Sequence, residues 1–276
     1  MKIKDLVSHY PQRVIGLLPA GGQATRIAPL PMSKELYPIG FRRGANGSLR
    51  PKVVCHYLLE KMRQAGVTTA YLVLRPGKWD IPNYFGDGTM LDMHLAYLTV
   101  HVPFGVPYTL DQAYPFVQDA VIALGFPDIL FQPQDAFAKI LARQANGSAD
   151  VVLGLFPTEQ PSKAGMVDFD LSGRVRYVIE KPLQTDLRYM WAIATWTPKF
   201  THFMHEYLKA IASQYSSDSE SLTEPRPELP IGDVIQAAID QGFRVEAEVF
   251  EQGRYLDIGT PENLAQAVRD AYEANW

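Results

Sequence analysis

Short, uninterrupted apolar runs alternate with helical segments along the first half of the chain, and this alternation limits the possible folds more than any other feature. Each run is too short for a helix and has the composition of a buried strand. The predicted strands are 14–18, 70–74, 120–124 and 151–156, and the predicted helices between them are 51–65 and 135–145. Strands that are apolar throughout are covered on both faces, so we predict an α/β fold whose sheet is mostly parallel and flanked by helices.

The pattern changes after about residue 160, where turn residues separate shorter extended segments. Residues 166–169 and 174–179 flank the turn sequence Asp170-Leu171-Ser172-Gly173, which predicts a β-hairpin. Further helices are predicted at 198–211, 231–240 and 263–272, with a strand at 243–249. We therefore predict a single domain over 1–276, with a Rossmann-like mixed sheet over about 12–160, a β-rich lobe over about 161–260 and a C-terminal helix over 261–276.

The composition is that of an ordinary globular protein and argues against two kinds of partner. Of the 276 residues, 47% are hydrophobic and 20% are charged, with a formal net charge of -4. Because no Lys/Arg-dense stretch accompanies this charge, we expect no nucleic acid as a partner. No apolar run reaches membrane-spanning length and the N-terminus lacks the apolar core of a signal peptide, so we expect a cytoplasmic protein that binds no membrane. The single cysteine, Cys55, is predicted to be a buried structural thiol.

The first predicted strand ends in a glycine-containing loop with the sequence Gly21-Gly22-Gln23-Ala24-Thr25-Arg26. Small residues let backbone N–H groups approach a phosphate chain, and Arg26 and Lys34 place two cations near the loop. Prolines in the stretch up to Gly40 exclude a regular helix directly after it. A dinucleotide fingerprint needs a third glycine and an immediate helix, and a P-loop needs Gly-Lys-Ser/Thr, so both motifs are excluded. The loop therefore favours a site for a triphosphate.

Five segments, in the expected order along the chain, resemble the signature motifs of sugar nucleotidylyltransferases. Residues 21–29 resemble G-G-x-G-T-R-L-x-P, and residues 33–39 resemble the S-K-Q-L-L-P-I continuation in glucose-1-phosphate thymidylyltransferases. Residues 86–88 resemble the G-D-G turn of that subfamily, residues 180–182 the E-K-P sugar-phosphate motif and residues 256–260 the W-x-D-T-G-T motif. The five matches extend over nearly the whole chain, so chance does not explain them.

The resemblance implies a nucleotidyl transfer in which a sugar 1-phosphate attacks the α-phosphorus of an NTP in line and pyrophosphate leaves. The protein then supplies position and positive charge, without a covalent intermediate. The resemblance places Arg26 at the leaving phosphates, Lys34 near the α-phosphate and Lys181 at the sugar phosphate as the catalytic residues. The nucleotide-binding residues that it implies are Ala20, Gly21, Gly22, Gln23, Ala24, Thr25, Thr109 and Gln112. Glu180 is expected to hold the sugar hydroxyls in the β-rich, sugar-binding lobe, and Gly165 to pack against the sugar.

The resemblance also implies Mg²⁺ as the cofactor, held by carboxylates together with phosphate oxygens and water. Asp257 matches the later aspartate of the family. Thymidylyltransferases carry the earlier one in L-G-D-N, whereas this chain reads Leu124-Gly125-Phe126-Pro127-Asp128, so the carboxylate lies two positions further on. We expect Asp128 to be the second metal ligand because it is the first acidic residue after the central strand. The alternative is that Asp128 only caps a turn after Pro127.

Two positions of the expected nucleotide pocket depart from the family pattern. Ala24 stands where the signature has its second glycine and adds a methyl group near the phosphates, and Thr109 stands where the family has a glycine against the base. The base is therefore left open, with dTTP or UTP favoured. Tyr189 and Trp191 either line the sugar pocket or belong to the core.

Two interpretations from other functional classes remain to be compared with this one. A catalytically silent relative that binds nucleotide or NDP-sugar agrees with the departures, but not with the retained Arg26, Lys34 and Asp257. A nicotinamide-dependent oxidoreductase needs an acidic residue after the second strand, where Arg75 stands. Larger family members append a further domain after the catalytic unit, whereas this chain ends soon after Asp257. We therefore expect a stand-alone catalytic domain whose partners are an NTP and a sugar 1-phosphate. Self-association into a homo-oligomer stays open.

Overall fold

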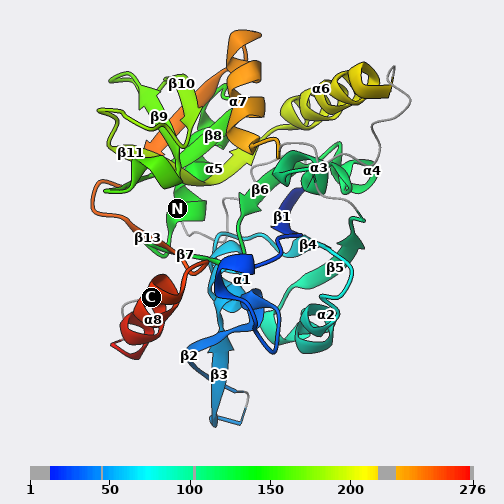
Figure 1. Ribbon diagram of the computed structural model, residues 1–276, viewed down its shortest axis with the longest axis vertical. Coiled ribbons are helices and arrows are strands. Elements are labelled where there is room, and N and C mark those ends of the chain that lie inside the picture. Colours follow the sequence, from blue (N-terminus) through cyan, green and yellow to red (C-terminus); the bar gives the residue numbers. More distant parts are fainter. Residues whose placement is uncertain (1–12, 45, 102–103, 217–227, 274–276) are drawn as a thin grey trace.

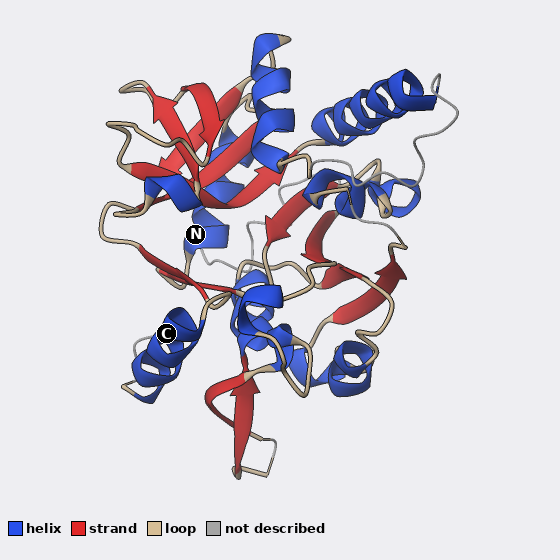
Figure 2. Ribbon diagram, in the orientation of Figure 1, coloured by secondary structure: helices blue, strands red, loops and turns tan. Residues whose placement is uncertain are grey.

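The structure, a computed structural model, describes residues 13–44, 46–101, 104–216 and 228–273 and is built around a nine-stranded mixed sheet (Figures 1 and 2). Two hydrophobic cores cover opposite faces of this sheet. In strand β1 (Val14–Ala20), Val14 packs into the core that contains helix α1 (Val54–Gln64), and Ile15 into the core that contains α3 (Val106–Asp111). The strand is therefore buried on both sides, as its uninterrupted apolar sequence predicts.

Most parallel pairs of the sheet come from the N-terminal half of the chain, and a further parallel pair joins β12 to β8. β1 pairs in parallel with β4 and β6, and β4 pairs in parallel with β5. β11 lies antiparallel to β6 and joins this part to β8, β9, β10 and β12. These strands are β4 (Thr69–Leu74), β5 (His94–Thr99), β6 (Val121–Gly125), β8 (Val151–Pro157), β9 (Gly165–Phe169), β10 (Val175–Glu180), β11 (Tyr189–Trp196) and β12 (Val245–Val249). The prediction of a mixed sheet flanked by helices is confirmed, with its parallel pairs concentrated in the first half.

Four of the longer helices lie on the two faces of the main sheet. α1 and α5 (Ala136–Asn146) contribute to one core, and α6 (Pro198–Ser216) and α7 (Ile231–Asp240) contribute to the other. The structure confirms α7 at its predicted bounds and the hairpin of β9 and β10. The helix predicted at 51–65 begins three residues later than expected, because its first residues continue strand β3 (Leu49–Val53). The spacing of apolar residues does not show where the backbone changes from strand to helix.

Two strands of the main sheet are not predicted by the sequence pattern. β5 is an edge strand whose side chains are all partly or fully exposed, and its apolar run, residues 95–98, is short and lies between two polar residues. β11 is buried and pairs with strands on both sides, but no clear turn signals bound its apolar residues. The short helices α2 (Asp80–Phe85) and α4 (Tyr114–Val117) also follow no recognisable period.

Two small two-stranded sheets lie beside the main one. β2 (Pro38–Arg43) and β3 form a hairpin that projects from the body of the molecule (Figure 1). β7 (Ile129–Gln132) pairs with β13 (Arg254–Asp257), which leads into the C-terminal helix α8 (Pro261–Tyr272). The hydroxyl of Thr260 accepts a hydrogen bond from the backbone N–H of Asn263 at 3.3 Å and so caps the N-terminus of this helix. Residues 274–276 of the predicted helix lie outside the described residues.

The remaining structural predictions concern the membrane and the cysteine. In the part of the chain that the structure describes, no helix combines the length and the apolar composition needed to cross a membrane. Cys55 is a free, buried thiol, as predicted. Burial raises the pKa of this thiol well above its usual value, which makes it a poor nucleophile at neutral pH.

Candidate active site

The glycine loop begins where β1 ends, at the carboxyl edge of the parallel strands. It continues through two single-turn 3-10 segments, Thr25–Ile27 and Lys34–Leu36, so no helix of the dinucleotide or P-loop type follows the strand. Ala24 has φ 55° and ψ 30°, a left-handed conformation in which an alanine costs about 1–2 kcal/mol more than in its preferred regions. The position where the signature motif has its second glycine therefore has the backbone conformation that favours glycine.

Two ion pairs bring the cations of this loop to the two aspartates expected to bind metal. The ammonium of Lys34 donates to Oδ2 of Asp128, and the Arg26 guanidinium lies 3.4 Å from Oδ2 of Asp257. Lys34 is largely buried, whereas Arg26 is exposed to solvent. Residues from three distant parts of the chain thus meet at one place.

The pairing of β7 with β13 explains why Asp128 reaches this place despite its displaced position. Asp128 immediately precedes β7, and Asp257 is the last residue of β13. The backbone N–H of Ile258 donates to the carbonyl oxygen of Asp128 at 3.1 Å, which continues the pairing past the end of the strands. The backbone hydrogen bonds between these strands therefore bring the two carboxylates close together. The number of residues that separates Asp128 from β6 does not decide this position.

The electrostatics of the cluster suit a bound cation. Burial raises the pKa of Asp257, and the neighbouring Asp128 carboxylate raises it further, against the opposing effect of the Gly259 N–H that donates to Asp257 Oδ1 at 2.8 Å. Burial alone would lower the pKa of Lys34, but Asp128 above all raises it above its usual value, so the lysine stays charged. Two carboxylates that repel each other beside buried positive charge would gain from a divalent ion.

Gly259 leaves the space in which Arg26 reaches Asp257. A Cβ at this position would lie 2.5 Å from an Arg26 guanidinium nitrogen and 2.9 Å from Asp257 Oδ1. The backbone of Asp257 is held in addition by the Asn263 side-chain amide, which donates to its carbonyl oxygen at 2.7 Å. Glycine at this position thus leaves room for the charged groups of Arg26 and Asp257 to pack closely.

A second cluster forms around Glu180 in the predicted sugar-binding lobe. Glu180 pairs with Gly165 across β9 and β10, and its carboxylate lies against the N-terminus of α7, where a Cβ on Gly232 would be 2.0 Å from Oε1. A Cβ on Gly165 would lie 2.5 Å from Nε1 of Trp191 and 2.6 Å from Glu180 Oε1. Trp191 is a buried member of the core and also adjoins this cluster. Burial raises the pKa of Glu180, and Asp233 raises it further.

Three further site residues implied by the resemblance are Lys181, Thr109 and Gln112. Lys181 has φ 48° and an exposed side chain that forms no ion pair with a described residue. Thr109 is buried on α3, and its Oγ1 would be 3.4 Å from a Cβ on Gly21, so it does pack over the glycine loop. Gln112 is exposed, and its side-chain amide donates to the Tyr108 carbonyl at 3.3 Å.

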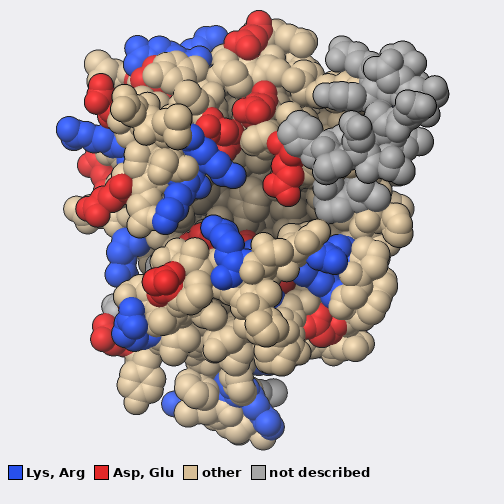
Figure 3. Space-filling view, viewed as in Figure 1, with Lys and Arg blue, Asp and Glu red and all other residues tan. Residues whose placement is uncertain are grey.

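Two cavities adjoin the first cluster, that of Lys34, Arg26 and the two aspartates. The face of the molecule seen in Figure 3 is hollowed across its middle, with basic side chains on both rims. One cavity, of about 560 Å³, is lined by the glycine loop, Lys34, Arg75 and Lys78. The other, of about 710 Å³, is lined by Arg26, Asp257, Lys163 and Arg188, among others. Both volumes are in the range of small-ligand sites.

Five basic residues of these cavities were not predicted: Arg75, Lys78, Lys163, Arg188 and Arg254. Arg75 and Lys78 follow β4, whose carboxyl end lies at the same edge of the sheet as the glycine loop. The rule that ligands bind beyond these ends would have found them if it had been applied to every parallel strand. Lys163 and Arg188 lie near strand ends of the β-rich lobe, where no sequence signal marks them.

Comparison with known proteins gives a consistent result. The sequence profile of the nucleotidyl transferase family matches residues 15–274. The chain is 27% identical over 259 residues to the low-salt glycan biosynthesis nucleotidyltransferase Agl11 of Haloferax volcanii, covering 91% of this chain and 64% of that protein. It is 27% identical over 263 residues to a glucose-1-phosphate thymidylyltransferase of Streptomyces antibioticus, covering 93% of this chain and 66% of the relative. The chain therefore spans slightly less than two thirds of the length of these two relatives.

Solved structures support the same fold. UDP-glucose pyrophosphorylase in complex with UDP-glucose superposes with a TM-score of 0.74 at 18% identity, covering 95% of this chain and 99% of that one. A candidate glucose-1-phosphate thymidylyltransferase from Bacillus anthracis superposes with a TM-score of 0.77 at 19% identity, covering 95% and 97%. At these identities the likeness concerns the fold.

Proposed function

The chain belongs to the nucleotidyl transferase family, and we propose that it transfers a nucleotidyl group from an NTP, with dTTP or UTP favoured, to a sugar 1-phosphate. The products are an NDP-sugar and pyrophosphate. The observation that carries this proposal is the convergence of Lys34 and Arg26 with Asp128 and Asp257 at the carboxyl edge of the sheet. The names of the relatives with 27% identity describe nucleotidyl and thymidylyl transfer, which agrees with it.

The two ion-paired cations would bind the phosphates of the NTP. Lys34 would neutralise charge at the α-phosphate while the sugar phosphate oxygen forms its bond to the α-phosphorus and the bond to pyrophosphate breaks. Arg26, exposed at the mouth of the second cavity, would hold the leaving phosphates. The attacking phosphate is already ionised at neutral pH, so the step needs no general base. Preorganised positive charge of this kind is worth about 10²–10³ in rate.

Asp128 and Asp257 would hold Mg²⁺. Their carboxylate oxygens are hard ligands. Burial raises the pKa of Asp257 and the neighbouring Asp128 carboxylate raises it further, and a bound cation would relieve this repulsion. When bound, the ion would neutralise phosphate charge and orient the triphosphate. The two aspartates would orient the ion, and the ammonium of Lys34, which donates to Asp128 Oδ2, would position that carboxylate.

Glu180 and Lys181 would hold the sugar 1-phosphate in the β-rich lobe. The Glu180 carboxylate lies beside Gly165 and Trp191 and could accept hydrogen bonds from sugar hydroxyls. Lys181, at the end of the same strand, is free of ion pairs with the described residues and would bind the phosphate. Thr109 over the glycine loop would contact the base and adjust its selection.

The test is release of pyrophosphate from the protein incubated with Mg²⁺, dTTP or another common NTP, and a panel of hexose 1-phosphates. One productive pair, lost in Lys34→Ala and in Asp257→Ala, is the expected result. Lys209→Ala is the matched control, because Lys209 is exposed and its one ion pair within the described residues is with Glu206 on its own helix. Nucleotide binding without turnover across the panel would favour the catalytically silent alternative. Absence of both turnover and nucleotide binding would overturn the proposal.

A further inference from the structure

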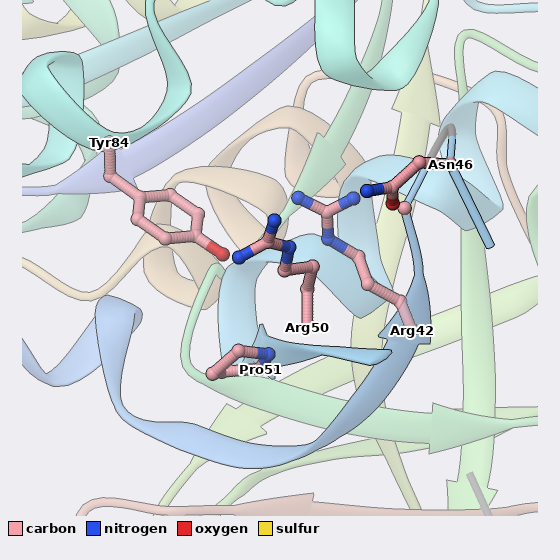
Figure 4. A pocket seen from close by; sticks show the side chains of 6 residues that line it. Arg42, Asn46, Arg50, Pro51 and Tyr84 are labelled. Carbon is pink, nitrogen blue, oxygen red and sulfur yellow. The ribbon is translucent and has the colours of Figure 1, made fainter. Parts of the chain in front are cut away.

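We propose that the β2–β3 hairpin and helix α2 form a second binding site, which takes the phosphate group of a small molecule. The site is a cavity of about 470 Å³ (Figure 4), large enough for a small ligand. Its lining residues are Arg42, Gly44, Asn46, Arg50, Pro51 and Tyr84. None of them belongs to the candidate active site, so the inference goes beyond the proposed transfer reaction.

The hairpin places two arginines directly opposite each other. Arg42 is paired with Arg50 in the antiparallel register, so the two side chains leave the same face of the hairpin. Two like charges in this arrangement destabilise a strand pair. Within residues 13–44, 46–101, 104–216 and 228–273, no carboxylate forms an ion pair with either guanidinium. The described part of the chain thus leaves two positive charges together without a counter-ion.

The guanidinium group of Arg42 has few hydrogen-bond partners among the described residues. Its Nε is buried and has no hydrogen-bond acceptor among the described residues, and the only contact of its terminal nitrogen is a weak one of 3.7 Å to the sulfur of Met90. A partly buried guanidinium without acceptors is unfavourable unless a group from outside the chain compensates it. The side chain is therefore positioned by packing and available to an external anion.

The donors of the cavity match a phosphate better than a carboxylate. Figure 4 shows the two guanidinium groups next to each other, with the Tyr84 hydroxyl directed toward Arg50 and the Asn46 amide beside Arg42. Among the residues that the structure describes, no acidic side chain lines the cavity. A phosphate monoester carries about -1.5 to -2 charges and three acceptor oxygens, which balances two arginines, whereas a single carboxylate balances one. The Tyr84 ring also offers a face on which a base or a sugar could pack.

The walls of this cavity are attached to the loop that carries Lys34. Asp80, the first residue of α2, accepts hydrogen bonds from the backbone N–H and the hydroxyl of Ser33, both at 2.6 Å. β2 begins two residues after the Lys34–Leu36 turn. A phosphate bound between Arg42 and Tyr84 would therefore contact both elements that flank the Lys34 turn.

Isothermal titration calorimetry on the full chain tests the site, with inorganic phosphate and AMP as probes. The protein carries Lys34→Ala throughout, which weakens phosphate binding at the active site and separates this experiment from the proposed function. Addition of Arg42→Ala or of Arg50→Ala is expected to weaken binding at least about tenfold, the loss typical of one charge-assisted hydrogen bond. The matched control is Arg43→Ala: Arg43 lies on the same hairpin, opposite Leu49, and its side chain leaves the other face. The control is expected to bind as tightly as its parent.

Two results would overturn the proposal. One is the absence of binding of either probe at millimolar concentration in protein whose circular dichroism spectrum is native. The other is an equal loss in the Arg43→Ala control, which would mean that binding follows the charge of the hairpin and not the cavity. If AMP binds more tightly than inorganic phosphate and Tyr84→Leu removes the difference, the ligand is a nucleotide. Equal binding of both probes identifies a simple phosphate group as the ligand.

Discussion

Asp128 and Asp257 lie at adjacent ends of the paired strands β7 and β13, where the N–H of Ile258 donates to the Asp128 carbonyl at 3.1 Å. Burial and the neighbouring carboxylate raise the pKa of Asp257. Because its folded-state pKa is higher than its unfolded one, the folded protein binds the extra proton as pH falls. Stability from this residue is therefore present below the unfolded pKa and is lost as pH rises through the folded pKa.

Asp257→Asn is accordingly expected to separate stability from activity. Asparagine keeps an oxygen for the Gly259 N–H but removes the repulsion from Asp128, so the melting temperature at pH 7 should be equal to or higher than that of the wild type. Turnover should fall about 10²–10³-fold, as for loss of a preorganised charge. Thermal melts with and without Mg²⁺ provide the measurement, and only the wild type should gain stability from the ion. A variant that melts lower and still responds to Mg²⁺ would contradict this account.

Gly232→Ala is expected to impair binding of the sugar 1-phosphate. The new Cβ would lie 2.0 Å from Oε1 of Glu180, so the carboxylate must move away from Gly165 and Trp191. Steady-state kinetics should show a higher KM for the sugar 1-phosphate, while the KM for the NTP, measured in the same variant, serves as the control. Alanine is otherwise the better helix former by up to about 1 kcal/mol, so a general loss of stability is not expected. An unchanged KM for the sugar phosphate would exclude Glu180 as its ligand.

Ala24→Gly is expected to keep or improve the stability of the glycine loop. Ala24 has a left-handed backbone, and glycine removes a steric penalty of about 1–2 kcal/mol while adding about 0.5–1 kcal/mol of unfolded-state entropy. The net gain in the free energy of unfolding should be about 0–1 kcal/mol in urea titrations. The control is Ala28→Gly in the same loop, where φ is −72° and the glycine should only destabilise. A loss of stability in Ala24→Gly equal to that of the control would argue against backbone strain at this position.

Lys78→Met tests the buried ion pair beside Lys34. Lys78 donates to Glu35 at 2.6 Å, and both side chains are almost fully buried, so removing the lysine leaves an unpaired buried carboxylate. Burial already raises the pKa of Glu35, and loss of Lys78, which lowers it, should raise it further. The destabilisation should therefore be about 3–5 kcal/mol at pH 8 and smaller at pH 5, where protonation of Glu35 removes the charge.

Urea titrations at the two pH values measure this effect. The double variant Glu35→Gln with Lys78→Met should recover much of the stability at pH 8, because no buried charge remains. Lys209→Met is the control: its partner Glu206 is exposed and the pair contributes little. Equal destabilisation at both pH values would show that the role of Lys78 lies in its packing and not in its charge.

Much of the fold could be predicted where local pattern and tertiary environment agree. The apolar runs of β1, β4, β6 and β8 and the period of α7 identified these elements, because each is buried along a whole face. β5 was missed because it is an edge strand with a short apolar run and no fully buried side chain, and the start of α1 was misplaced because β3 runs directly into it. The prolines after the glycine loop correctly excluded a helix.

By itself, the sequence determined the types of residue at the candidate site and the local backbone that presents them. The loop after β1, the left-handed position at Ala24 and the hairpin that ends at Glu180 follow from short-range sterics and hydrogen bonding. Only the tertiary structure decided that Asp128 meets Asp257 and Lys34, that Glu180 lies against α7, and that two arginines of the β2–β3 hairpin face Tyr84. Such contacts depend on strand register and on the packing of distant segments, and no local pattern of residues contains that information.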